Sequence, residues 1–172
     1  AVLKTDLAIP SPGPDDVLVK VRYAAICGTD QHIYNWNSWA EERLQLPMVF
    51  GHEFSGEIVA LGANVTGYSL GDRVAAETHI PCNRCVQCEG GFSDYARIPK
   101  DCVWKLDDAI SYKHAAMLEP MGVAVHGVMS GQTALKSIVI LGCGPIGVMA
   151  VGAAKAAGAS RVFAVDIFDD KL

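Results

Sequence analysis

The 172-residue chain has no block of basic residues, no long uninterrupted apolar run and no internal repeat. Its formal net charge of −5 predicts neither a nucleic-acid partner nor binding to an anionic membrane. No basic and then apolar leader is visible, so we expect no secretory signal. The longest uncharged stretch, residues 137–154, is interrupted by Gly142, Gly144 and Pro145, whereas a membrane-spanning helix needs about 20 apolar residues.

Hydrophobic residues make up 51% of the chain, which excludes a disordered tail and predicts a packed core. Three of the six cysteines, Cys82, Cys85 and Cys88, fall within seven residues. Such crowding suits metal binding in a reducing compartment better than a disulfide framework. We therefore expect a soluble cytoplasmic protein.

The first two thirds of the chain read as a β-rich unit. Short strand-like runs cover residues 17–22, 57–61, 72–76 and 94–98, and glycines separate them. Many short strands with frequent turns predict an all-β or α+β fold. Residues 114–129 lack strand alternation, and we expect one or two buried helical turns there, broken near Pro120 and Gly122.

The last third reads as a β-α-β unit, with a buried strand at 137–141, a helix at 146–157 and a second strand at 161–165. The motif G-x-G-x-x-G joins the first strand to the helix, where a dinucleotide-binding turn belongs. In that turn the first glycine bends the chain, the second lets a pyrophosphate approach and the third packs helix against strand. The candidate cofactor-binding residues are Gly142, Gly144, Pro145, Ile146 and Gly147.

Asp166 follows Gly147 by 19 residues, at the end of the second strand. A carboxylate at this place can bind both ribose hydroxyls and repels the 2′-phosphate of NADP, so the pattern favours NAD. A tight strand–helix turn without a ligand is the alternative reading.

Cys27, His52 and Glu53 offer the ligand types that a catalytic zinc uses: thiolate, imidazole and carboxylate. Taken singly, Cys27 reads as a small buried residue and His52 as a turn histidine. The residues around them change this interpretation. From Gly51 the chain reads G-H-E-x-x-G-x-x-x-x-x-G-x-x-V, and in this motif it resembles the zinc-dependent medium-chain alcohol dehydrogenases.

This resemblance implies a GroES-like catalytic domain over residues 1–121 and an incomplete Rossmann NAD-binding domain over 122–172. It implies that Cys27, His52 and Glu53 bind a catalytic Zn²⁺, with Glu119 near the metal as an alternative ligand. Thr29 and His32 would relay the alcohol proton outward. The implied reaction transfers hydride from a secondary alcohol to NAD, in a homodimer or homotetramer.

Residues 27–36, CGTDQHIYNW, resemble the threonine-oxidising branch of the family, which forms 2-amino-3-oxobutanoate. Two alternatives to this function remain. One is a polyol dehydrogenase of sorbitol type, and the other is a non-catalytic fragment or binding module with the same fold. By resemblance Cys82, Cys85 and Cys88 join a fourth cysteine in a structural zinc site. Position 96, where that cysteine is expected, is alanine. A Rossmann fold needs several parallel strands, and this chain supplies two, so we expect that it is part of a longer polypeptide from which segments are missing.

Overall fold

The computed structural model describes residues 1–77 and 90–172. The chain folds as two compact units, residues 1–117 and residues 118–172. Among the described residues, no helix has both the length and the apolar character needed to cross a membrane. The boundary between domains at residues 121 and 122 stays a prediction.

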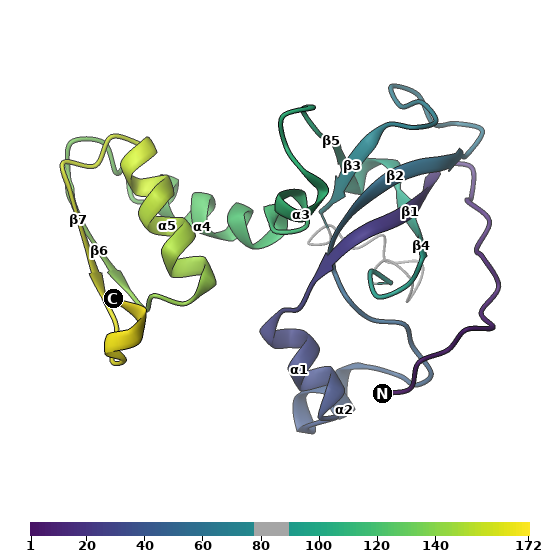
Figure 1. Ribbon diagram of the computed structural model, residues 1–172, viewed down its shortest axis with the longest axis horizontal. Coiled ribbons are helices and arrows are strands. Elements are labelled where there is room, and N and C mark those ends of the chain that lie inside the picture. Colours follow the sequence, from purple (N-terminus) through teal and green to yellow (C-terminus); the bar gives the residue numbers. More distant parts are fainter. Residues whose placement is uncertain (78–89) are drawn as a thin grey trace. The chain divides into compact units, whose positions relative to one another are not determined.

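The first unit is built on a five-stranded sheet (Figure 1). Its strands lie in the order β4-β1-β2-β3-β5, and every neighbouring pair is antiparallel. The four predicted runs are confirmed as strands, although β2 begins four residues earlier than expected, and β5 was not predicted. The strands are β1 Asp16–Ala25, β2 Glu53–Leu61, β3 Arg73–Ala76, β4 Tyr95–Pro99 and β5 Val103–Lys105.

The core of this unit consists of side chains that the sheet brings together. Phe54 and Ile58 of β2 are fully buried, as are Val17 and Val19 of β1. Truncating a fully buried phenylalanine such as Phe54 to alanine costs about 3–5 kcal/mol. The candidate metal ligands therefore lie at or next to the ends of strands that are anchored in this core.

Short helices follow two strands of the sheet. Helices α1 (Gly28–Tyr34) and α2 (Ser38–Arg43) come after β1, and α3 (Tyr112–Ala115) comes after β5. Cys27 caps α1 and Asn37 caps α2, each accepting a backbone N–H with its side chain. A helix as short as these depends on such caps and on packing, because its propensity alone does not stabilise it. Neither α1 nor α2 was predicted from the sequence.

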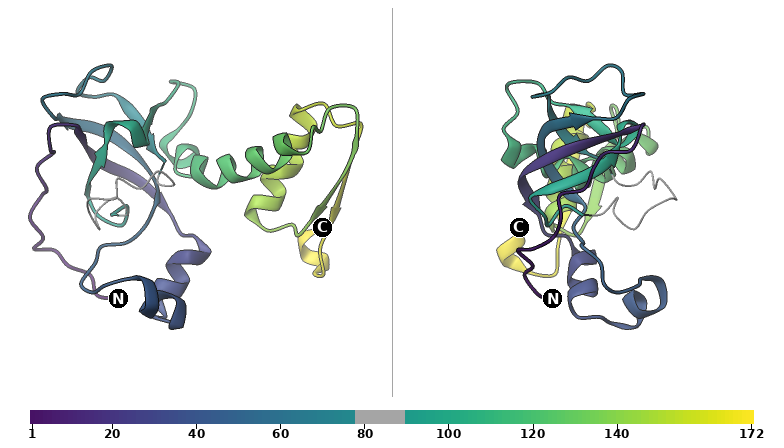
Figure 2. Two further views of the ribbon diagram at one scale, coloured as in Figure 1. Left: turned by 180° about the vertical axis from the view of Figure 1, so that it is seen from behind. Right: turned by 90° about the vertical axis from the view of Figure 1, so that its right-hand side faces the viewer.

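The second unit contains α4 (Leu118–Ser130), β6 (Ser137–Leu141), α5 (Pro145–Ala156) and β7 (Arg161–Val165). β6 and β7 pair in parallel, as the predicted β-α-β unit requires. Helix α5 packs on this pair and α4 packs on α5, as Figure 2 shows from behind. A 3₁₀ turn, Asp169–Lys171, follows β7.

Two expectations for this region are wrong. The helix does not break near Pro120 and Gly122, because Pro120 lies in the first turn of α4, where its missing N–H has no intrahelical acceptor to lose. The break lies instead between α3 and α4. β6 is not buried, since Val139 and Leu141 are 58% and 81% exposed. A sheet of two strands cannot enclose both of its faces.

Candidate metal and cofactor sites

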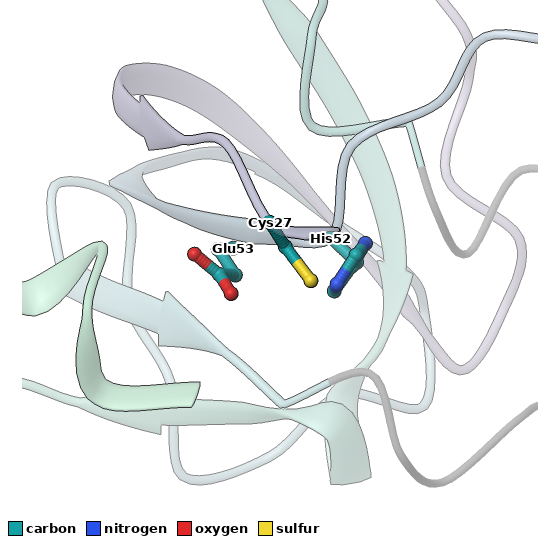
Figure 3. Close-up of side chains that lie close together, drawn as sticks. All are labelled: Cys27, His52 and Glu53. Carbon is teal, nitrogen blue, oxygen red and sulfur yellow. The ribbon is translucent and has the colours of Figure 1, made fainter. Parts of the chain in front are cut away.

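The pairing of β1 with β2 brings the three candidate metal ligands together. Ala25, the last residue of β1, lies opposite Glu53, the first residue of β2. Cys27 follows β1 by two residues and His52 directly precedes β2. Antiparallel pairing therefore places residues that are 25 apart in the sequence at one end of the sheet. Figure 3 shows the three side chains converging on one space.

One possible ligand atom from each of Cys27, His52 and Glu53 lies within 4.8 Å of the other two. Tetrahedral zinc with bonds of 2.0–2.3 Å holds its ligand atoms about 3.5 Å apart, so small side-chain movements close the set. Glu53 is buried, and the exposed fraction of the His52 side chain is 15%. A mixed sulfur, nitrogen and oxygen set at a partly open position fits zinc.

Asp30 supports this cluster, a role that the sequence analysis did not assign. Its carboxylate accepts the backbone N–H of Cys27 at 2.8 Å, which completes the capping box of α1. Its second oxygen, Oδ1, is buried without a hydrogen bond and lies 3.6 Å from Nδ1 of His52. A carboxylate beside Nδ1 favours the ring tautomer whose Nε2 is free to bind a metal. The capping-box spacing of Cys27 and Asp30 was the signal available in the sequence.

Gly51 shapes the turn into His52. Its φ of +98° lies in the left-handed region, and a Cβ atom at this position would lie within 3 Å of Phe92. The carbonyl of Gly51 accepts the N–H of Gly91, and the carbonyl of Phe50 accepts the N–H of Phe92. A glycine is therefore needed where the metal-binding segment joins the sheet.

A pocket of about 500 Å³ opens beside Cys27. Phe50 and Phe92 stack edge to face along it, with ring centroids 5.2 Å apart. Gln31 and Tyr34 of α1 extend the lining. The pocket combines aromatic walls with a few polar groups, which is the usual composition of a site for a small organic molecule.

The structure places the other predicted site residues as follows. Thr29 lies in the first turn of α1, and its N–H donates to Sγ of Cys27 at 3.4 Å. His32 lies one turn further along α1 and is exposed. Glu119 lies in the second unit, buried in the first turn of α4. The predicted structural-zinc residues lie outside the described residues: Cys82, Cys85 and Cys88.

The three glycines of the predicted dinucleotide turn differ in surroundings as the motif requires. Gly142 has a φ of +97°, which bends the chain after β6. No atom lies within 4 Å of a Cβ added to Gly144, so a ligand can approach its backbone. A Cβ on Gly147 would overlap the carbonyl oxygen of Gly142. Pro145 and Ile146 open helix α5, whose free N–H groups suit a phosphate.

Asp166 binds the turn directly. Its Oδ2 accepts the N–H of Cys143 at 2.7 Å, and its Oδ1 accepts the N–H of Phe168 at 3.1 Å. The hydrogen bond from Cys143, followed by that from Phe168, holds the pKa of Asp166 below its ordinary value. The carboxylate therefore stays ionised beside the turn.

Comparison with known proteins identifies the family of the chain. Residues 13–108 match the alcohol dehydrogenase GroES-like domain. The chain belongs to this family. Its fold class is the predicted one, a GroES-like domain followed by an incomplete Rossmann domain.

Curated relatives include the L-threonine 3-dehydrogenases of Symbiobacterium thermophilum and Bacillus velezensis. The first is 44% identical over 97% of this chain and 53% of its own length, and the second is 46% identical over 100% and 55%. The alignment with the Bacillus velezensis protein runs over 191 residues, so that relative has segments without a counterpart in this chain. The chain spans about half the length of these relatives.

Among solved structures, galactitol-1-phosphate dehydrogenase from Escherichia coli superposes with a TM-score of 0.84 at 30% identity. The match covers 98% of this chain and 53% of that enzyme. The agreement in fold therefore extends to a relative whose name states a different alcohol substrate.

Proposed function

We propose that the protein is a zinc- and NAD-dependent dehydrogenase that oxidises a secondary alcohol, with L-threonine as its substrate. The observation that carries this proposal is the cluster of Cys27, His52 and Glu53 beside a pocket, in a chain whose second unit forms a dinucleotide turn.

Cys27, His52 and Glu53 would hold the metal, whose chemistry is to lower the pKa of the bound alcohol. Asp30 orients His52, and the capping of α1 fixes the backbone of Cys27. Phe50 and Phe92 would give the substrate an apolar surface beside the metal cluster. Thr29 and His32 carry the alcohol proton from the metal site to water. Glu119 is an alternative ligand of the same metal ion.

NAD would bind at Gly142–Gly147, with its pyrophosphate at the N-terminus of α5. Gly144 leaves room for this approach. The ionised Asp166 binds the ribose hydroxyls and disfavours the extra phosphate of NADP. Equal affinity for the two cofactors in a fluorescence titration would contradict this part of the proposal.

L-Threonine is favoured as substrate by the names of the relatives that are 44–46% identical over nearly the whole chain. A polyol substrate is the second candidate, favoured by the structural match to galactitol-1-phosphate dehydrogenase. Kinetics of the full-length zinc enzyme on L-threonine and on sorbitol distinguish the two. We expect a larger kcat/KM for L-threonine, and a larger value for sorbitol would select the alternative.

We further propose that the protein is a cytoplasmic homodimer or homotetramer. Its two domains would meet between residues 121 and 122, and Cys82, Cys85 and Cys88 would belong to a structural zinc site. Light scattering coupled to size exclusion measures the subunit number. A monomeric active enzyme would contradict the assembly. A protein that binds zinc and NAD but oxidises no alcohol would instead support the non-catalytic alternative.

A further inference from the structure

Asn37 makes four hydrogen bonds at the junction of α1 and α2, and two of them join it to His32. Its carbonyl accepts the N–H of Glu41 at 2.9 Å. Its side-chain Oδ1 accepts the N–H of Ala40 at 3.2 Å, which caps α2. Its side-chain Nδ2 lies 2.7 Å from Nδ1 of the His32 ring. Its backbone N–H donates to the carbonyl of His32 at 3.4 Å.

These contacts determine which nitrogen of His32 carries the proton. An amide nitrogen donates hydrogen bonds and does not accept them, so Nδ1 of His32 must be the acceptor. Exchanging the amide oxygen and nitrogen of Asn37 would turn an N–H group toward the N–H of Ala40 and remove the cap. The neutral His32 ring therefore carries its proton on Nε2.

The backbone holds Asn37 in this position. Trp36 has a φ of +45°, in the left-handed region that few residues other than glycine adopt. This conformation reverses the chain directly before Asn37, so that the residue reaches back to α1. The indole of Trp39 packs near the His32 ring, with centroids 6.1 Å apart. Backbone strain at such a place persists only when its surroundings maintain it.

His32 and His52 of the first unit thus have opposite partners. His52 turns Nδ1 toward the carboxylate of Asp30, whereas His32 turns Nδ1 toward an amide donor. We propose that Asn37 is a positioning residue that holds His32 in the Nε2–H tautomer, so that His32 accepts a proton only when its hydrogen bond to Asn37 breaks. This proposal rests on the relay role given to His32 in the proposed function. When the bond breaks, Nδ1 gains the alcohol proton and Nε2 releases its own proton to water.

The tautomer is measured directly by ¹⁵N NMR of the full chain labelled at histidine, with the His32 signals assigned by His32→Gln. We expect an unprotonated Nδ1 and a protonated Nε2 at neutral pH. In Asn37→Asp the carboxylate still caps α2 but accepts from Nδ1–H, so at a pH where the ring is neutral the two signals should exchange character. Gln132→Glu makes the same amide-to-carboxylate change at an exposed position of the second unit and should leave the tautomer unchanged. A protonated Nδ1 in the unmodified protein, or an unchanged spectrum in Asn37→Asp, overturns the inference.

Turnover of the full-length enzyme then tests the link to the reaction. The carboxylate in Asn37→Asp stabilises a protonated His32, so the acid limb of the kcat profile should move to higher pH by about one unit. Arg43, which lies over the indole of Trp39, is the same in both variants. Gln132→Glu should leave the limb in place. A switched tautomer with an unmoved limb counts against the relay role in the proposed function, while the tautomer assignment stands.

Discussion

The metal cluster of the first unit joins residues from two segments, whereas the dinucleotide turn of the second unit lies within six consecutive residues. Cys27 and His52 meet because β1 and β2 pair in register up to their ends. The turn at Gly142–Gly147 depends on local backbone geometry and on one carboxylate, Asp166. The first site should therefore fail when a ligand or its support is lost, and the second when its backbone is crowded.

Removing a ligand of the metal cluster should have the largest effect. Cys27→Ser or His52→Ala should lower kcat by about 10³-fold, because a bound metal contributes several kcal/mol and each 1.36 kcal/mol is a factor of ten. NAD affinity, measured by fluorescence titration, should change little. Cys102→Ala, which alters a buried cysteine of the sheet core, is the control for loss of a thiol. Equal loss of turnover and NAD binding would show that the two sites do not act separately.

Removing the charge of Asp30 should have a smaller effect on the same site. In Asp30→Asn an oxygen still accepts the N–H of Cys27, but an amide donor faces Nδ1 of His52. That donor favours a proton on Nε2, so zinc affinity should fall about 10–100-fold. Competition with a chromophoric chelator measures the affinity. Asp101→Asn changes an exposed carboxylate and should leave it unaltered. An unchanged affinity in Asp30→Asn would remove Asp30 from the account.

Alanine substitutions at two glycines of helix α5 distinguish the effect of steric crowding on stability from that of helix propensity. Gly147→Ala should destabilise the second unit by about 1–3 kcal/mol, because the new methyl overlaps the carbonyl of Gly142. A Cβ on Gly152 meets no atom within 4 Å, so Gly152→Ala should stabilise the helix by up to about 1 kcal/mol. Chemical denaturation measures both changes. Equal effects of the two substitutions would contradict the close packing inferred for the turn.

The smallest expected effect is a pH dependence of folding stability that arises from Asp166 in the dinucleotide turn. The hydrogen bonds from Cys143 and Phe168 lower the pKa of Asp166 below its ordinary value of 3.8. A lowered folded-state pKa stabilises the fold above the ordinary value, and this contribution is lost as pH falls through the lowered pKa. Unfolding followed from pH 6 to pH 3 should thus lose less stability in Asp166→Asn than in the unmodified chain. Asp170→Asn should behave like the unmodified chain, and a matching profile in Asp166→Asn would refute the assignment.

A site that is formed within one local segment can be predicted from the sequence more fully than a site that strand pairing assembles from two segments. The glycine roles at Gly142, Gly144 and Gly147 were predictable because each depends on backbone geometry within one turn. The role of Asp30 was not assigned, since it depends on the distance to His52, which only the β1–β2 register creates. Helices α1 and α2 escaped prediction because their stability comes from capping by Cys27 and Asn37, and neither helix shows apolar periodicity.

We propose above all that Cys27, His52 and Glu53 bind zinc. Elemental analysis of the full-length protein, compared with His52→Ala, tests it most directly, because metal content does not depend on knowing the substrate. We predict that His52→Ala loses one zinc ion per chain and keeps its fold and its affinity for NAD. A zinc content that is the same in both proteins would contradict the account.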